Sequence, residues 1–216
     1  GYYTRAQQFP EITSGTIASV LNTTTFPLMS SLQNNKDELA IIIKRLIKMT
    51  AMVVFPAMIG LACLSEPIIL VLLGEKWLPA SNLLFWISLS YIFTPLSILN
   101  MNVLNAIGRS DLFLKIDLIK IPFIILTMII TFPISMKAIV IGKAVTAFLW
   151  FCINGFLIGK FYNFGPLKQL LCCCKYIVSA IIMAIIVIFI DNIIDSDVLS
   201  LIIGLMSGVF SYMLCL

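Results

Sequence analysis

The chain has 216 residues, of which 61% are hydrophobic and only 11% are charged, and its formal net charge is +4. Soluble globular domains are about 45–50% apolar and about 25% charged, so this composition excludes an ordinary water-soluble domain. It predicts an all-α, polytopic membrane protein, and the small positive charge does not call for a nucleic-acid partner. There is no histidine, and the six cysteines lack the spaced pairs of a zinc site, so neither a metal nor a cofactor is expected.

Seven long runs of residues without a charged side chain lie between the charged residues. A helix needs roughly 17–25 mostly apolar residues to cross a bilayer, and long basic side chains at its ends can complete a shorter run. The sequence therefore predicts about seven transmembrane helices. The runs are residues 12–35, 49–65, 77–108, 121–136, 144–159, 176–190 and 198–216.

The first predicted span differs from the others because hydroxyl and amide side chains are dense between residues 13 and 31. Polar groups at membrane depth face neighbouring helices or a wet cavity, and Ser or Thr can also bond back to carbonyls of its own helix. Tight helix packing and a cavity wall both remain open interpretations of this span.

The next segments carry interruptions. Residues 36–50 have helical apolar spacing and predict an amphipathic lead-in at the cytoplasmic interface, and Pro56 predicts a kink in the second span. Residues 65–81 are too short to cross and predict an interfacial helix, with Trp77 at the headgroups and Pro79 opening the third span. Pro95 breaks that long third span, and its asparagines predict contact with water or other helices.

Lysines and arginines are distributed unevenly between the connections. The first, third and fifth connections hold ten of the fourteen, the other side holds three, and Lys143 lies within a span. By the positive-inside rule the ten-cation side faces the cytoplasm. The N-terminal segment then lies outside. Because it has no initiator Met or signal-peptide pattern, we expect the chain to begin within a longer protein.

Two lysines lie deeper than this topology requires. Lys143 is about two turns inside the fifth span, and Lys120 is two to three turns beyond the GRSD turn at residues 108–111. An ionisable group at the bilayer centre costs at least about 2.5–3.5 kcal/mol, so each is a functional candidate by default. Snorkelling to the headgroups is the competing interpretation for both.

Four segments occur in an order that resembles a known family. They are GYYTRA (residues 1–6), FPLMSSLQ (26–33), LLGEKWLPAS (72–81) and NAIGRSDLFLKIDLIK (105–120). Together they resemble the C-terminal half of the polysaccharide transporters, which are Wzx-like O-antigen and exopolysaccharide flippases. This family lies within the multidrug/oligosaccharidyl-lipid/polysaccharide superfamily, which also includes the multidrug-and-toxin extrusion (MATE) transporters. The resemblance covers about residues 1–160, and beyond Tyr162 it continues only as hydropathy.

The resemblance implies a fold of two six-helix lobes around a central cavity, often with two extra helices. Residues 1–216 would be helices 8–14 of 14, with residues 1–160 as the core of the C-terminal lobe and residues 161–216 as two accessory helices. The first lobe would lie outside this chain. Family members carry the segment matching Gly1, Tyr3, Arg5 and Ala6 in the extracytoplasmic connection after helix 7, which agrees with the orientation from charge.

The implied activity is alternating-access transport of an undecaprenyl-pyrophosphate-linked oligosaccharide across the bacterial inner membrane. Implied partners are this lipid-linked substrate, the bilayer, the first lobe of the same protein and a polysaccharide polymerase. From their chemistry, Arg109, Lys120 and Lys143 are candidates for offsetting the pyrophosphate charge, and Thr16, Asn22 and Thr23 for facing the sugars.

Other functions are weighed against this one. A MATE-type drug or cation antiporter shares the fold but needs carboxylates, and only Asp117, between Lys115 and Lys120, approaches membrane depth. A membrane-embedded glycosyltransferase would need acidic or His-containing sites on larger loops, so no enzyme is expected. A non-transporting scaffold remains a third alternative.

Overall fold

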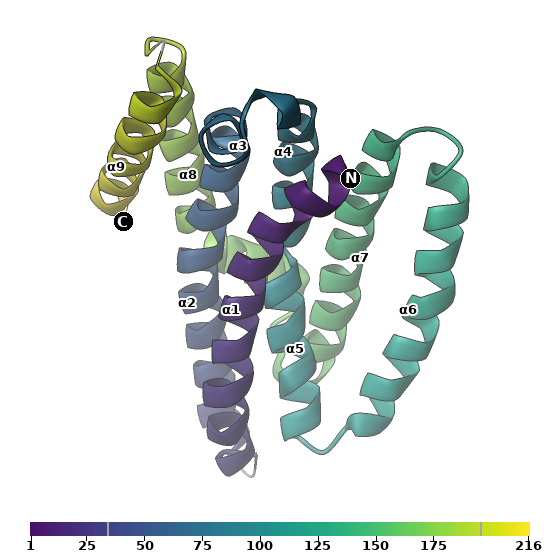
Figure 1. Cartoon of the computed structure of the whole chain (residues 1–216). Coiled ribbons are helices and arrows are strands. Elements are labelled where there is room, and N and C mark those ends of the chain that lie inside the picture. Colours follow the sequence, from purple (N-terminus) through teal and green to yellow (C-terminus); the bar gives the residue numbers. More distant parts are fainter. Residues whose placement is uncertain (34, 195) are drawn as a thin grey trace.

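The computed structural model describes residues 1–33, 35–194 and 196–216 (Figure 1). Helices make up nearly all of this part of the chain, and no strand occurs in it. The elements are α1 (Tyr2–Ser31), α2 (Lys36–Cys63), α3 (Ser65–Leu73), the 3-10 turn η1 (Glu75–Trp77), α4 (Pro79–Tyr91), α5 (Thr94–Ala106), α6 (Ser110–Thr131), α7 (Met136–Tyr162), α8 (Pro166–Asp191) and α9 (Asp197–Cys215).

The predicted long helices are all present. The third span is divided into α4 and α5, and the break at Ile92 and Phe93 comes just before Pro95, which occupies the first turn of α5. Proline lacks a backbone donor and is tolerated in a first turn, which explains why the helix restarts there. Pro79 opens α4 as predicted, whereas Pro56 lies within an unbroken α2.

Five helical segments of the described chain are long and apolar enough to cross a membrane, namely residues 36–63, 79–106, 136–162, 166–191 and 197–215. The long helices α1 and α6 are more polar. Hydroxyl and amide side chains are dense in α1, and the first half of α6 carries Lys115, Asp117 and Lys120. The polar content of these two helices becomes important at the cleft described below.

The amphipathic lead-in is not a separate interfacial element. Residues 36–50 form the first half of α2 and continue in one helix through the second span. Leu39, Ile43 and Ile47 are completely buried inside the bundle, so their apolar stripe packs on protein and does not lie on a lipid interface. The helical periodicity predicted for residues 36–50 is confirmed, and its apolar face packs against other helices.

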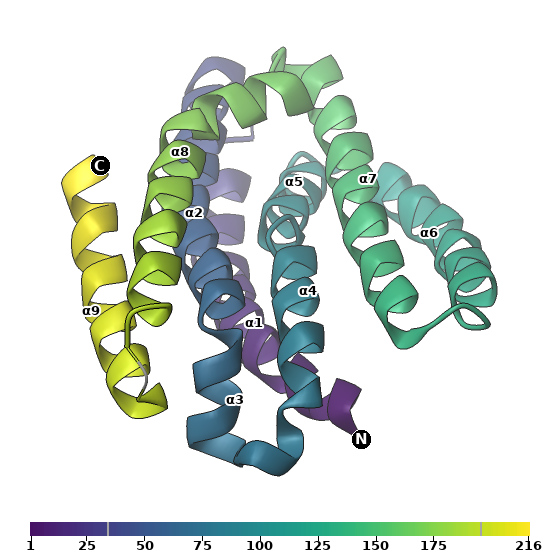
Figure 2. The ribbon, with the colours of Figure 1, turned by 90° about the horizontal axis from the view of Figure 1, so that it is seen from above.

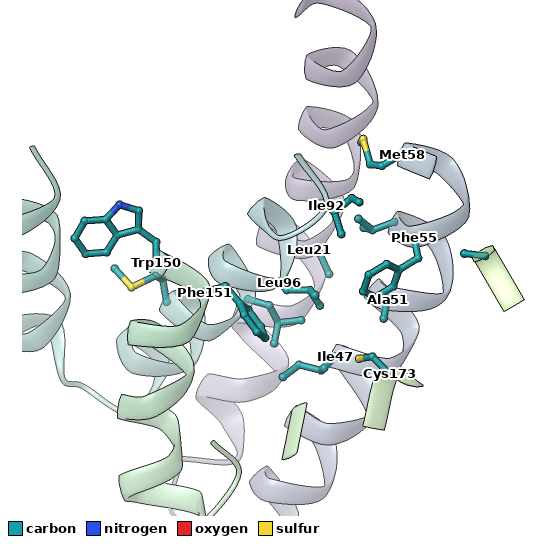
Figure 3. Close-up of a cluster of buried hydrophobic side chains, with 14 of the residues drawn as sticks. Leu21, Ile47, Ala51, Phe55, Met58, Ile92, Leu96, Trp150, Phe151 and Cys173 are labelled. Atoms are coloured by element: carbon teal, nitrogen blue, oxygen red, sulfur yellow. The ribbon is translucent and has the colours of Figure 1, made fainter. Parts of the chain in front are cut away.

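The helices pack in two groups, with α1, α4 and α5 between them. On one side α2 packs against α8, and α8 against α9, while on the other α7 packs against α6 (Figure 2). Between them α1 contacts α4 and α5, and these in turn contact α2 and α7. A cluster of buried side chains joins the groups, including Leu21, Phe55, Leu96 and Phe151 (Figure 3).

Successive long helices alternate in direction, so the connections gather at two ends. The end of α1, the start of α2 and the connection between α5 and α6 lie at the lower end in Figure 1. The basic residues of the first and third connections, which the sequence predicts to share one side, belong to these segments. At the other end, Trp77 packs edge-on against Tyr2, with ring centroids 5.5 Å apart, and Arg5 lies 5.8 Å from the Trp77 ring. The structure is therefore consistent with the topology deduced from charge.

Candidate functional site: a polar cleft between α1, α5, α6 and α7

A cleft with a volume of about 770 Å³ lies between α1, α5, α6 and α7. Small-molecule sites typically measure about 300–1,000 Å³. Its walls carry many polar side chains for a protein so apolar. The polar side chains are those of Tyr3, Gln7, Asn22, Thr94, Ser97, Asn102, Asn105, Asp117, Lys120, Thr127, Thr131, Lys143, Thr146, Trp150 and Asn154.

The cleft exists because α6 stands away from α1. Helix α6 contacts α7 and α5, and Ile116 is its one buried residue. Helix α6 approaches α7 closely at Gly142, where an added Cβ atom would lie 2.9 Å from Cγ2 of Thr127 and 3.0 Å from Cγ2 of Thr131. Glycine permits this close contact, and α6 is held there at the side of the cleft.

Lys143 projects from α7 into the cleft and is half-buried. Its Nζ atom donates a hydrogen bond to the Tyr91 hydroxyl at 3.2 Å and lies 4.5 Å from the centroid of that ring. An ammonium over an aromatic face is attracted by the ring quadrupole, which helps to hold it away from bulk water. The side chain therefore points at protein and cleft rather than snorkelling along the outside of α7.

Lys120 lines the same cleft from α6, one helical turn after Asp117. It lies eleven residues before the end of α6, and Lys143 lies seven residues after the start of the antiparallel α7. At 1.5 Å of rise per residue, the two lysines differ in depth by roughly 6 Å. The fold thus brings two ammonium groups, 23 positions apart in the sequence, to similar depth in one cleft.

The three predicted residues of the first span separate in the structure. Asn22 lines the cleft and accepts a 2.6 Å hydrogen bond from Nδ2 of Asn102 in α5. Thr16 and Thr23 are exposed and do not line it, and their hydroxyls donate to the carbonyl oxygens of Ile12 and Ser19 at 2.8 and 3.0 Å. Much of the hydroxyl content of α1 is thus satisfied by its own helix.

Arg109 lies outside the cleft, at the connection between α5 and α6. Its guanidinium donates to both carboxylate oxygens of Asp111 at 2.9 and 3.1 Å and lies 5.5 Å from the Phe161 ring. The Arg109 hydrogen bonds hold the pKa of Asp111 below its usual range. Arg109 therefore acts locally at the basic end of the bundle, where the charge distribution of the sequence already explains its presence.

Sequence reasoning missed the polar floor of the cleft on α7. Trp150 and Asn154 are buried there, and the Asn154 Nδ2 atom donates a 2.7 Å hydrogen bond to Oγ of Ser97 in α5. Both residues lie inside the charge-free run 144–159, which attracts attention only to its hydropathy. The available signal was that Asn154 is the sole amide side chain of that run.

The fold has a counterpart among solved structures. Over 99% of its length the chain resembles the lipid II flippase MurJ in its inward closed conformation, with a TM-score of 0.78 and 19% sequence identity, and it covers 45% of that chain. At this identity the similarity is one of fold. The chain therefore has the all-helical, multi-pass architecture of a membrane transporter.

Sequence comparison finds similarity to proteins of polysaccharide biosynthesis. Residues 1–82 match the family model described as polysaccharide biosynthesis protein. The teichuronic acid biosynthesis protein TuaB of Bacillus subtilis is 35% identical over 115 residues, which are 52% of this chain and 23% of that protein. The succinoglycan biosynthesis transport protein ExoT of Rhizobium meliloti is 27% identical over 154 residues, covering 71% of this chain and 30% of ExoT.

These matches confirm the resemblance to polysaccharide transporters that the four sequence segments predicted. The chain spans less than a third of the length of these two relatives. The division into a lobe core at residues 1–160 and two accessory helices at residues 161–216 remains a prediction.

Proposed function

We propose that the chain is part of a flippase that moves an undecaprenyl-pyrophosphate-linked oligosaccharide across the bacterial cytoplasmic membrane. The observation that carries the proposal is the cleft, which Lys120 and Lys143 line together with amide and hydroxyl side chains. The names of TuaB and ExoT, which refer to polysaccharide biosynthesis and transport, support this class of substrate.

The chemistry of the cleft suits the polar part of such a lipid. A pyrophosphate and a glycan must leave water together, while the prenyl tail can stay among the acyl chains. The two ammonium groups offset the phosphate charge with charge-assisted hydrogen bonds, and the amides and hydroxyls replace water around the sugars. This division of roles favours transport without covalent chemistry.

The proposed location is the inner membrane, with the basic connections in the cytoplasm. Because the relatives are several times longer than the matched region, we place the chain as one part of a larger transporter. Alternating access then results from rocking of this part against a second lobe, the mode expected for repeat-built transporters.

A cation or drug antiporter is the second candidate, because Asp117 also lines the cleft. The lysines weaken this candidate. Lys120 lies one turn from Asp117 on the same helix, and Lys143 faces the same space, so both repel a bound cation electrostatically.

Complementation tests the proposal directly. The protein in its natural full-length form is expressed in a strain that lacks its own flippase, and surface polysaccharide is measured with a matched glycan pathway. Restored surface polysaccharide is the expected result. Proton-coupled dye efflux without any restored polysaccharide would replace the flippase by the antiporter.

Lys120→Met and Lys143→Met test the cleft in the same assay. Each removes one ammonium group, so we expect export to fall at least tenfold with unchanged protein level, since loss of a charge-assisted hydrogen bond costs about 1.5–3 kcal/mol. Lys115→Met is the matched control, because Lys115 is exposed on α6 and does not line the cleft. Normal export in both cleft variants would show that neither ammonium group contributes to transport.

A further inference from the structure

Two polar atoms in the floor of the cleft have no hydrogen-bond partner within the described residues. They are Nε1 of Trp150 and Oδ1 of Asn154, and their side chains are only 6% and 4% exposed. Leaving a buried polar group unpaired is costly, so native proteins usually satisfy such groups with protein, water or a ligand. Both residues line the cleft, which is where a ligand could reach them.

The positions of the two atoms complement one another. Trp150 and Asn154 are four residues apart on α7 and so lie on the same helix face, with Cβ atoms typically about 5–6 Å apart. The Trp150 ring is fixed by an edge-on contact with Phe123 of α6, with centroids 6.0 Å apart. In Figure 3 the Trp150 side chain lies at the edge of the buried cluster and points away from Phe151. The Asn154 amide is fixed by its bond to Ser97.

The hydrogen-bonding character of the pair restricts the ligand. An indole N–H only donates, and a carboxamide oxygen only accepts. A phosphate or carboxylate can accept from Trp150 but would face the Asn154 oxygen with another acceptor. A neutral group that both accepts and donates, such as a sugar hydroxyl or the acetamido group of an amino sugar, satisfies both atoms.

We propose that Trp150 and Asn154 form a sugar-binding subsite, in which a neutral sugar group accepts from Nε1 of Trp150 and donates to Oδ1 of Asn154. The assignment deepens and rests on the proposed flippase function. It separates two roles within the cleft: the lysines take the pyrophosphate, and the floor of α7 takes the glycan.

Thr50 provides a matched control. Its hydroxyl oxygen is likewise buried and without a partner in the described chain, but it lies on α2 and does not line the cleft. Thr50→Val removes an unpaired polar atom that no ligand in the cleft can reach. A general effect of removing such atoms would therefore also occur in this variant.

The test compares lipids with and without sugar. The protein in nanodiscs is titrated with undecaprenyl pyrophosphate and with its glucosyl, galactosyl and N-acetylglucosaminyl derivatives, and dissociation constants are measured by calorimetry. At least one glycosylated lipid should bind more tightly than undecaprenyl pyrophosphate. Trp150→Phe and Asn154→Ala should each raise the dissociation constant of that lipid about 3–10-fold, as expected for one neutral hydrogen bond. The dissociation constant of undecaprenyl pyrophosphate should change by less than about twofold in both variants. Thr50→Val should change neither.

A second readout shows whether each variant is still folded and whether the contact is direct. The chain has three tryptophans, so Trp77→Phe with Trp86→Phe leaves Trp150 as its sole tryptophan, which is excited selectively at wavelengths where tyrosine does not absorb. Its emission should shift with the glycosylated lipid and not with undecaprenyl pyrophosphate, and Asn154→Ala should reduce this shift. Unfolding temperatures of all variants exclude loss of structure as the cause.

The outcomes separate the subsite from the flippase. The subsite is overturned if no glycosylated lipid binds more tightly than undecaprenyl pyrophosphate. It is also overturned if the two substitutions weaken the binding of both lipids equally, or weaken the binding of neither. In those cases binding of undecaprenyl pyrophosphate that depends on Lys120 and Lys143 still supports the flippase. Conversely, sugar-dependent binding through Trp150 and Asn154 without any pyrophosphate binding leaves the subsite standing and removes the flippase proposal.

Discussion

Thr50 illustrates how a single unpaired atom affects stability. Its buried hydroxyl has no partner in the described residues, and valine has the same shape without the polar atom. We expect Thr50→Val to stabilise the protein by about 1 kcal/mol, because the desolvation cost of the hydroxyl is removed. For a chain of this size that corresponds to a rise of about 2–4 °C in Tm, measured by thermal unfolding in detergent. A lower Tm would show that Thr50 has a partner in the membrane.

Single residues also show what could be read from the sequence. Lys120 and Lys143 are identifiable because each lies deeper than the topology of the basic connections requires, and both line the cleft. Thr16 and Thr23 were chosen on grounds of polarity. Their outward positions depend on how α1 is rotated against α4 and α5, and residue type alone does not encode this rotation.

At the scale of elements, the contact of α6 with α7 depends on Gly142. The methyl groups of Thr127 and Thr131 occupy the space of a Cβ atom, and each threonine is fixed by a hydroxyl bond to the carbonyl four residues earlier. Gly142→Ala should therefore push α6 outward. Gly15→Ala in α1 is the control, since no atom lies within 4 Å of its added Cβ.

Both glycine substitutions gain the same helix propensity, so their difference isolates the steric effect. We expect Gly142→Ala to be less stable than Gly15→Ala by about 1–3 kcal/mol, the usual cost of overpacking. Thermal unfolding of the two variants provides the measurement. Equal stabilities would mean that the threonines rotate away and that α6 is not held at this point.

Helix α5 is tied to α8 by a buried pair of amides. Asn100 and Gln169 are both fully buried and exchange two reciprocal hydrogen bonds of 3.0 Å. Each single substitution to leucine should destabilise the protein by about 1–3 kcal/mol, because it removes both reciprocal bonds from the buried partner amide. Gln169 keeps its 3.1 Å bond from Nε2 to the carbonyl oxygen of Phe164, so Asn100→Leu should be the milder of the two. The double variant should cost less than the sum, and a double-mutant cycle measures this coupling.

Coupling in membrane proteins averages about 0.6 kcal/mol and reaches about 1.7 kcal/mol, so a value in this range is expected for Asn100 and Gln169. Additive effects would instead show that each amide finds another partner when one is removed. The sequence predicted that the asparagines of this span meet water or other helices. It did not reveal that the partner lies 69 positions away.

At the scale of the whole molecule, the charge distribution predicts the orientation of the bundle. In a variant whose six native cysteines are replaced by alanine, Ser110→Cys lies at the end with the basic connections and Ile134→Cys at the opposite end. A membrane-impermeant thiol reagent applied to intact cells should label position 134 and not position 110. In inverted vesicles the pattern should reverse. Labelling of both positions from the same side would contradict the topology.

The number of long helices and the gathering of basic connections at one end follow from the amino-acid sequence alone. These features depend on local properties, because apolar length, proline position and charge act on each segment separately. Family resemblance from four short segments was also readable, since it depends on order and spacing along the chain.

The position of the cleft and its lining follow from the packing of the helices. Helix α6 packs on α7, with a close contact at Gly142, and Lys120 of α6 lines the same cleft as Lys143 of α7. This packing also places Trp150 and Asn154, hidden in an apolar run, in the floor of the same cleft. Such a site depends on the rotation and separation of whole helices, which packing between distant segments sets and no single segment specifies.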